Sequence, residues 1–252
     1  MNSIITGKNI VKIFGKGNEQ TMALNGVNVE IAKGEFVAVM GPSGSGKSTL
    51  LFALSGMDEI TSGSVKFGDT ELSKLNENVL ADARRTKMGF IFQQPTMLRN
   101  LNLLDNIMLP AVHEGKKDTA KLTQKAKVLM KKTGLAGLES RATTEVSGGQ
   151  LQRAGICRAL INSPEILFAD EPTGALNSKS AEEIMGLLLE INKEGTAILL
   201  VTHDAKVSAM ANRVLFTKDG NIVSELPLQK FSGREMESRW ETVLAGMAAV
   251  GI

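Results

Sequence analysis

The sequence predicts an α/β fold with a mostly parallel central sheet, a small N-terminal antiparallel β-subdomain and an inserted helical lobe. Unbroken apolar runs at 36–40 and 166–169 suit strands that are covered on both faces, as in parallel sheets. The run 27–31 alternates apolar and polar residues, which suits a half-exposed antiparallel strand. From 96 to about 162 the apolar residues follow helical spacing instead. Helices are therefore expected to interrupt the sheet.

A glycine-rich loop between the apolar run 36–40 and a helical run at 48–54 indicates a phosphate site. It follows the pattern G-x-x-x-x-G-K-[ST] of phosphate-binding loops. The glycines permit a tight turn whose N–H groups point at phosphate oxygens, and the next helix adds its positive end. We expect Lys47 to reach the β- and γ-phosphates and the Ser48 hydroxyl to ligate Mg²⁺. A ligand-free glycine turn is the alternative. The predicted nucleotide-binding residues are Gly41, Pro42, Ser43, Gly44, Ser45, Gly46, Lys47, Ser48 and Thr49.

The composition restricts the classes of protein to consider. With 252 residues, the chain can form one large domain or two close lobes. Cys157 is its only cysteine, which excludes an intrachain disulfide and suits a reducing cytosol. The net charge of +2 is too small for bulk electrostatic binding to nucleic acid or membrane. Residues 1–8 do not resemble a signal peptide, and no apolar stretch approaches the roughly 18 residues of a membrane span. We expect any membrane association to require a partner.

Two residues of the first half leave alternatives open. Phe14 lies in the apolar run 10–15, where core packing is favoured over a ring that stacks on adenine. A strand and turn at 65–69 and a basic helix at 79–87 follow, and then a buried strand at 88–92 ends in Gln93. A carboxamide at the carboxyl end of such a strand either contacts a ligand or simply terminates the strand.

The middle third carries a possible second anion site. Apolar spacing predicts a helix over 122–133, ending near Gly134, after a solvated loop at 114–118. Another helix runs to Leu160 and starts at a stretch that contains a good N-cap and exposed N–H groups. This stretch is either a capped helix start or an anion site aimed away from the first loop. Its residues are Ser147, Gly148, Gly149 and Gln150.

Two carboxylates close the apolar strand 166–171. Buried acids are costly unless they are paired or ligate a metal. Asp170 is therefore expected in the Mg²⁺ shell, and Glu171 is expected to polarise a water against the γ-phosphate. The strand 197–201 brings His203 to the same edge, although a lone histidine is more often structural.

The C-terminal part contains a hairpin and an amphipathic helix. Residues 218–221 are a hairpin turn signal between strands at 213–216 and 222–226. The helix over 236–247 carries the only tryptophan, Trp240. Packing on its own domain or on a dimer mate is favoured over a membrane or partner surface. We expect a nucleotide-binding domain at 3–227, with a helical lobe at 96–162, and a C-terminal extension at 228–252.

Taken in order and spacing, these motifs resemble the ATP-binding subunit of ABC transporters across essentially the whole chain. The resemblance rests on the phosphate loop, Gln93, the signature 146–150, the pair Asp170 and Glu171, and His203. It implies a P-loop NTPase fold with ATP and Mg²⁺ as cofactors. It also implies that Phe14 stacks on adenine, that Gln93 contacts magnesium and couples to the transporter, that Glu171 is the general base, and that His203 senses the γ-phosphate.

The resemblance further implies a head-to-tail homodimer, in which each signature faces ATP held by the other copy. ATP binding would close the dimer and hydrolysis would loosen it, which would drive a membrane permease at the cytoplasmic face of a bacterial plasma membrane. No nucleic-acid partner is implied. Val146 and Asn177 stand where the family usually has Leu and Asp, and the second change bears on communication between the two sites.

Within the family, the segments 105–110 and 168–176 and the C-terminal extension resemble the branch that handles macrolides, lipoproteins and antimicrobial peptides. The bacitracin-type peptide-resistance transporters are the nearest likeness, which implies peptide export or resistance and a sensor histidine kinase acting through the permease. The alternatives are a macrolide or lipoprotein-release transporter, a soluble ATPase acting on DNA or the ribosome, and an ATP-binding scaffold that does not hydrolyse.

Overall fold

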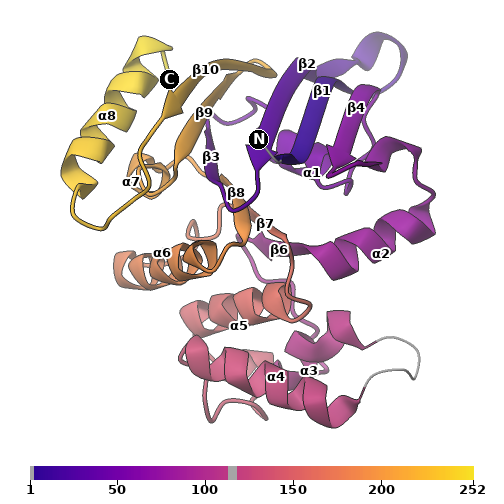
Figure 1. Cartoon of the computed structure of the whole chain (residues 1–252), viewed down its shortest axis with the longest axis vertical. Helices are drawn as coiled ribbons and strands as arrows, with labels where there is room; N and C mark the ends of the chain where they lie inside the picture. Colours follow the sequence, from indigo (N-terminus) through magenta and orange to yellow (C-terminus); the bar gives the residue numbers. More distant parts are fainter. Residues whose placement is uncertain (1–2, 113–117) are drawn as a thin grey trace.

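A computed structural model describes residues 3–112 and 118–252, within which the strands form a four-stranded and a six-stranded sheet (Figure 1). The loop expected at 114–118 lies outside the described residues except for Asp118, whose carboxylate accepts hydrogen bonds from the backbone of Ala120 and Lys121. Asp118 therefore caps the helix that follows.

The N-terminal sheet is antiparallel, as expected from the alternating pattern. Its strand order is β2-β1-β4-β5. The long strand β1 pairs with β2 on one side and with β4 on the other, so that Ile5 faces Ile31 and Phe67. The strands are β1 (Ser3–Phe14), β2 (Thr21–Ala32), β4 (Ser62–Phe67) and β5 (Thr70–Glu71).

The central sheet is mostly parallel and has the order β10-β9-β3-β8-β7-β6. The strands β3 and β8 are buried throughout, because helices or the other sheet cover both faces, and this explains their unbroken apolar sequences. Only β10 runs antiparallel, as the second arm of the expected hairpin. The strands are β3 (Phe36–Met40), β6 (Met88–Phe92), β7 (Ile166–Asp170), β8 (Ala197–Val201), β9 (Arg213–Lys218) and β10 (Asn221–Pro227).

The helices divide between the sheets and a separate lobe. Against the sheets lie α1 (Lys47–Leu54), α2 (Glu77–Lys87), α6 (Ser178–Lys193), α7 (Ala205–Ser208) and α8 (Met236–Ala249). The lobe contains α3 (Leu103–Met108), α4 (Thr119–Lys132) and α5 (Gly148–Leu160). Short 3-10 turns occur at Gly17–Glu19, Leu72–Lys74, Leu109–Ala111 and Thr143–Glu145.

The lobe has a hydrophobic core of its own, at the end of the molecule opposite β10 and α8 in Figure 1. Ile107, Ala126 and Met130 are fully buried in it. Cys157 also lies there, beside Thr133, and burial raises the pKa of its thiol to about 11. The cysteine is therefore a packing residue.

Helix α8 packs one face on its own domain, as expected from the interpretation that the sequence favoured. Val243 is fully buried against the second core cluster, and Trp240 and Met247 pack on the same cluster. Arg239 reaches inward and donates hydrogen bonds of 2.6 Å to the carbonyls of Ala209 and Ala211, just after α7. No described helix combines the length and the apolar character needed to cross a membrane.

Candidate nucleotide site

The phosphate loop joins β3 to α1 and requires glycine at defined positions. Gly44 and Gly46 have φ angles of +80° and +95°, in the left-handed region that disfavours side chains. A Cβ atom on Gly41 would lie 2.2 Å from the carbonyl oxygen of Thr217, and one on Gly46 would lie 2.5 Å from that of Ala23. The loop is therefore held between β2 and β9, and its path cannot be kept with larger residues.

The loop opens onto a cavity of about 290 Å³. The Nζ atom of Lys47 lies 2.9 Å from the carbonyl oxygen of Gly41 and 2.8 Å from that of Pro42. Burial lowers the pKa of Lys47, while the charges of Glu171 and Asp170 oppose that shift. A partly desolvated ammonium at the N-terminus of α1 suits a polyphosphate. The cavity is lined by Ala23, Ser43, Gly44, Gly46, Lys47, Ser48, Thr49 and Glu171.

Three of the predicted loop residues, Gly41, Pro42 and Ser45, do not line this cavity, and the side chain of Ser45 is engaged elsewhere. Its hydroxyl is buried and lies 2.9 Å from that of Thr217. The predicted contact with nucleotide therefore cannot come from this hydroxyl in the conformation described.

Asp170 meets the phosphate loop at Ser48. The Ser48 hydroxyl donates a hydrogen bond of 2.9 Å to Oδ1 of Asp170 at the end of β7. Burial raises the pKa of the Asp170 carboxyl, and the hydrogen bond from Ser48 opposes the shift. A hydroxyl and a carboxylate are the hard oxygen ligands that Mg²⁺ prefers, so these two side chains fit a magnesium ion that also binds phosphate oxygens.

Glu171 and His203 form a pair at the same edge of the sheet. The Nδ1 atom of His203 lies 3.1 Å from Oε1 of Glu171. The Glu171 backbone adopts a φ of +44°, which is rare for a residue with a side chain, and its N–H donates to the carbonyl of Val201. Asp204 caps α7 directly after His203. The strained turn and the cap together define the backbone from which the two side chains extend.

Gln93 also approaches the carboxylate. A Cβ atom on Gly174 would lie 2.8 Å from Nε2 of Gln93 and 3.2 Å from Oε2 of Glu171. The two polar side chains therefore converge on Gly174, and a side chain at this position would displace them.

The signature lies apart from this cavity, on the helical lobe. Ser147 is the N-cap of α5 and forms a capping box with Gln150. In this box the Ser147 N–H donates a hydrogen bond of 2.8 Å to Oε1 of Gln150. Ser147 and Gly148 are exposed, whereas Gly149 approaches Ser180 on α6. Asn177 caps α6 by accepting a hydrogen bond of 2.9 Å from the N–H of Ser180. Asn177, which stands where the family usually has Asp, therefore still caps the helix.

Phe14 corrects the interpretation favoured from residues alone. Its side chain is not core, because the residue is 44% exposed at the end of β1. The ammonium of Lys12 lies 4.8 Å from the ring centroid. Phe14 is not among the residues that line the loop cavity, and its open ring is available for stacking.

Sequence reasoning missed two features of this region. Ala23 lines the cavity from β2, and no local pattern marks it. Gln152 contacts the backbone on both sides of the site and is only 1% exposed. Its position on the apolar-facing side of α5 could have indicated that the side chain is buried.

Comparisons with known proteins agree with this geometry. The family model described as ABC transporter matches residues 24–174. The chain is 44% identical over 223 residues to the macrolide export ATP-binding/permease protein MacB of Mannheimia succiniciproducens, an alignment that covers 88% of this chain and 34% of that protein. The chain thus spans about a third of the length of this relative.

Two further matches extend over nearly whole proteins. An uncharacterized ABC transporter ATP-binding protein of Methanocaldococcus jannaschii is 42% identical over 220 residues, which cover 87% of this chain and 98% of that one. The dimeric post-hydrolysis structure of the ATP-binding cassette MJ0796, bound to ADP and Pi, superposes with a TM-score of 0.83 at 38% identity, covering 90% of this chain and all of that one. The chain therefore belongs to the ABC transporter family, as an ATP-binding cassette.

Proposed function

We propose that the chain binds Mg-ATP at the phosphate loop, hydrolyses it, and drives a membrane permease by ATP-dependent head-to-tail dimerisation. The observation that carries the proposal is the pairing of Glu171 with His203, 3.1 Å apart. This pair stands at the edge where Ser48 meets Asp170, and Glu171 lines the same cavity as Lys47.

Each polar side chain has a proposed part in the reaction. Ser48, Asp170 and Gln93 would hold Mg²⁺, which neutralises charge on the phosphates when bound. Glu171 would accept a proton from the attacking water, and His203 would orient that carboxylate and contact the γ-phosphate. Phe14, exposed beside Lys12, would stack on adenine.

Dimerisation is proposed because the signature and the phosphate loop lie on different parts of one chain. The N-terminus of α5 presents exposed N–H-bearing residues on the lobe, away from the loop cavity. Two copies related by a two-fold axis would place each signature over the other copy's ATP. The superposed cassette MJ0796 is itself described as dimeric, which supports the proposal.

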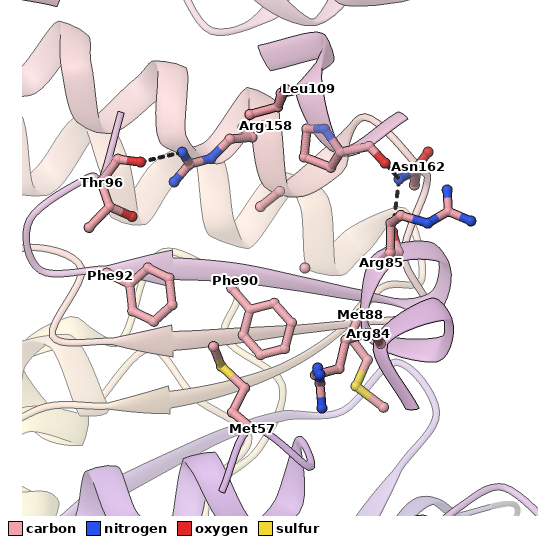
Figure 2. A pocket seen from close by; sticks show the side chains of 14 residues that line it. Met57, Arg84, Arg85, Met88, Phe90, Phe92, Thr96, Leu109, Arg158 and Asn162 are labelled. Atoms are coloured by element: carbon pink, nitrogen blue, oxygen red, sulfur yellow. Dashed lines mark hydrogen bonds between the residues drawn. The ribbon is translucent and has the colours of Figure 1, made fainter. Parts of the chain in front are cut away.

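A groove of about 390 Å³ between the sheet and the lobe is the proposed docking site for the permease (Figure 2). Its floor is apolar, with the rings of Phe90 and Phe92 stacked along β6 and Met57 nearby. Leu109 lies on the lobe side, and Met57 and Leu109 are 46% and 43% exposed. Because Gln93 follows Phe92 directly, a segment seated here would act on the nucleotide site.

The groove also carries positive charge. Arg84, Arg85 and Arg158 line it, although Arg84 and Arg85 are already ion-paired with Glu77 and Asp82. The Arg158 guanidinium donates to the carbonyl of Thr96 at 2.6 Å (Figure 2). Burial lowers the pKa of Arg158, which makes a neighbouring negative charge favourable. We therefore propose that the permease segment is an apolar helix with an acidic residue.

The proposed cargo follows the relatives. MacB is named as a macrolide export protein, so macrolide-type export is favoured over the peptide export that the sequence suggested. The chain would work at the cytoplasmic face of the membrane, where ATP is available. The sensor histidine kinase stays a prediction, because no relative named above bears on it.

Phosphate release from Mg-ATP by the purified chain tests the hydrolysis step. Glu171→Gln should lower turnover by roughly 10²-fold or more, the general-base contribution, and leave ATP affinity in place. Glu182→Gln, the same change on the exposed face of α6, is the matched control and should keep full turnover. Equal turnover by Glu171→Gln and wild type would show that Glu171 is not the general base. A wild type that dimerises with ATP but does not hydrolyse it would favour the scaffold alternative.

Membrane recruitment tests the groove. We expect the double variant Met57→Glu/Leu109→Glu to leave the membrane fraction of cells that make the permease, because two carboxylates would be buried on docking. Val128→Glu, on an exposed apolar residue of α4, should stay with the membrane. Retention of the double variant would contradict docking at the groove.

A further inference from the structure

Gln152 is a buried carboxamide that bridges two loops of the nucleotide site. It lies on α5, two residues after the end of the signature, and is 1% exposed. Its Nε2 atom donates a hydrogen bond of 2.9 Å to the carbonyl of Phe92 and another of 2.9 Å to the carbonyl of Pro172. Because both acceptors are carbonyls, the nitrogen must face them, and each of its hydrogens has one partner.

The two carbonyls stand at the points where neighbouring strands separate. The pairing of β6 with β7 ends at Phe92 and Asp170. Beyond this pair the ladder no longer holds the two segments together, and Gln152 takes over that connection. The carbonyl of Phe92 belongs to the peptide bond that leads into Gln93, while Pro172 directly follows Glu171.

Gln152 therefore bonds the backbone next to each of the two polar side chains that converge on Gly174. Other side chains of α5 each reach a single segment. Arg158 contacts the carbonyl of Thr96, and Arg153 forms an ion pair with Glu183 of α6 at 2.5 Å. Gln152 alone, among the described residues of α5, bonds both site segments at once. A shift of α5 is thus transmitted to both.

Filling space does not explain a carboxamide at this position. Within the described part of the chain, Oε1 of Gln152 has no hydrogen-bond partner. A buried acceptor without a partner is unfavourable, and a methionine or leucine of similar size would not introduce one. Unlike those apolar side chains, the amide donates two hydrogen bonds.

We infer that Gln152 is a positioning residue that couples the signature helix to Gln93 and Glu171 through the carbonyls of Phe92 and Pro172. The inference rests on the proposed function, since it assigns how motion of the lobe reaches the reacting groups. When α5 moves, for example on contact with the second copy, Gln152 moves both loops in register. Without its two donors the loops would respond separately.

The test is Mg-ATP turnover of Gln152→Met, which keeps the side-chain length and removes both donors. We expect kcat to fall about 10-fold or more, as for misplaced catalytic groups, with the ATP dissociation constant within about 2-fold of wild type. Gln124→Met makes the same change on the exposed face of α4 and should keep full turnover. Should Gln152→Met not fold, Gln152→Leu carries the same expectation, because it also removes both donors and adds no charge.

A double-mutant cycle with Gln93→Ala separates positioning from packing. If Gln152 acts in part through Gln93, Gln152→Met lowers turnover by a smaller factor in the Gln93→Ala background than in wild type. If the two single losses of turnover multiply fully in the double variant, the inference is overturned. Full turnover by Gln152→Met would overturn it as well. Neither result would contradict the proposed function, provided that wild type is active. An inactive wild type would instead contradict the proposed function itself.

Discussion

The hydroxyl of Ser48 donates a hydrogen bond of 2.9 Å to Oδ1 of Asp170, which lies 122 positions later in the chain. The bond joins the N-terminal turn of α1 to the end of β7, and β8 lies between β3 and β7 in the sheet. The phosphate loop and the acidic strand end are therefore parts of one site. A change at Asp170 is expected to affect both stability and Mg²⁺ binding.

Asp170→Asn should stabilise the nucleotide-free chain at neutral pH. Burial raises the pKa of Asp170, so the folded state disfavours its charge. The stability that this group contributes is fully present below its unfolded pKa of about 3.9 and is lost as the pH rises through the higher folded value. Asparagine avoids that loss, and we expect the Tm at pH 7.5 to rise by about 2 °C or more.

The pH dependence supplies the control for Asp170→Asn. Thermal melts at pH 7.5 and pH 4 should show the advantage of the variant shrinking in acid, where wild-type Asp170 is increasingly protonated. The variant Asp170→Asn should also have lower Mg²⁺-dependent turnover than wild type. An advantage that is equal at both pH values would mean that the charge of Asp170 is not its cause.

Lys47→Ala should abolish tight ATP binding. The ammonium lies at the N-terminal end of α1, partly desolvated, and it is the loop's mobile positive charge. We expect a loss of about 100-fold or more in nucleotide affinity by fluorescence titration, as for removal of a charge-assisted contact. Lys33→Ala, in an exposed turn, is the control. Wild-type affinity in Lys47→Ala would refute the assignment.

Helix α8 gives a matched pair of neighbouring residues. Val243 is fully buried against the second core cluster, whereas Leu244 is 41% exposed. Val243→Ala should cost about 1–2 kcal/mol of unfolding free energy, and Leu244→Ala should cost less than about 0.5. Urea denaturation measures both. Equal costs would contradict the packing of α8 on its own domain.

Much of the fold could be predicted because burial on both faces leaves a clear trace in sequence. The runs 36–40 and 197–201 are apolar throughout, and the parallel sheet places their carboxyl ends together. The meeting of Ser48, Asp170, Glu171 and His203 follows from that rule and needs no knowledge of side-chain positions. The division at 227/228 between domain and extension stays a prediction.

The remainder depends on contacts between distant segments. Phe14 was expected in the core because its neighbours are apolar, yet it lies at the end of β1, where the ring is left open. The groove takes Met57, Phe90 and Leu109 from separate elements, and none of them is unusual in its own segment. Gln152 lies on the apolar-facing side of α5, but its two acceptors are known only once the loops that it bonds are placed.

The mass of Glu171→Gln in solution, measured by light scattering with and without Mg-ATP, tests the central claim most directly. ATP should join two copies through composite sites, and the slowed hydrolysis should preserve the dimer. We predict a mass of 27.0 kDa without nucleotide and twice that value with Mg-ATP. Lys47→Ala/Glu171→Gln should remain monomeric under both conditions. A Glu171→Gln chain that stays monomeric at saturating Mg-ATP would contradict dimerisation driven by ATP.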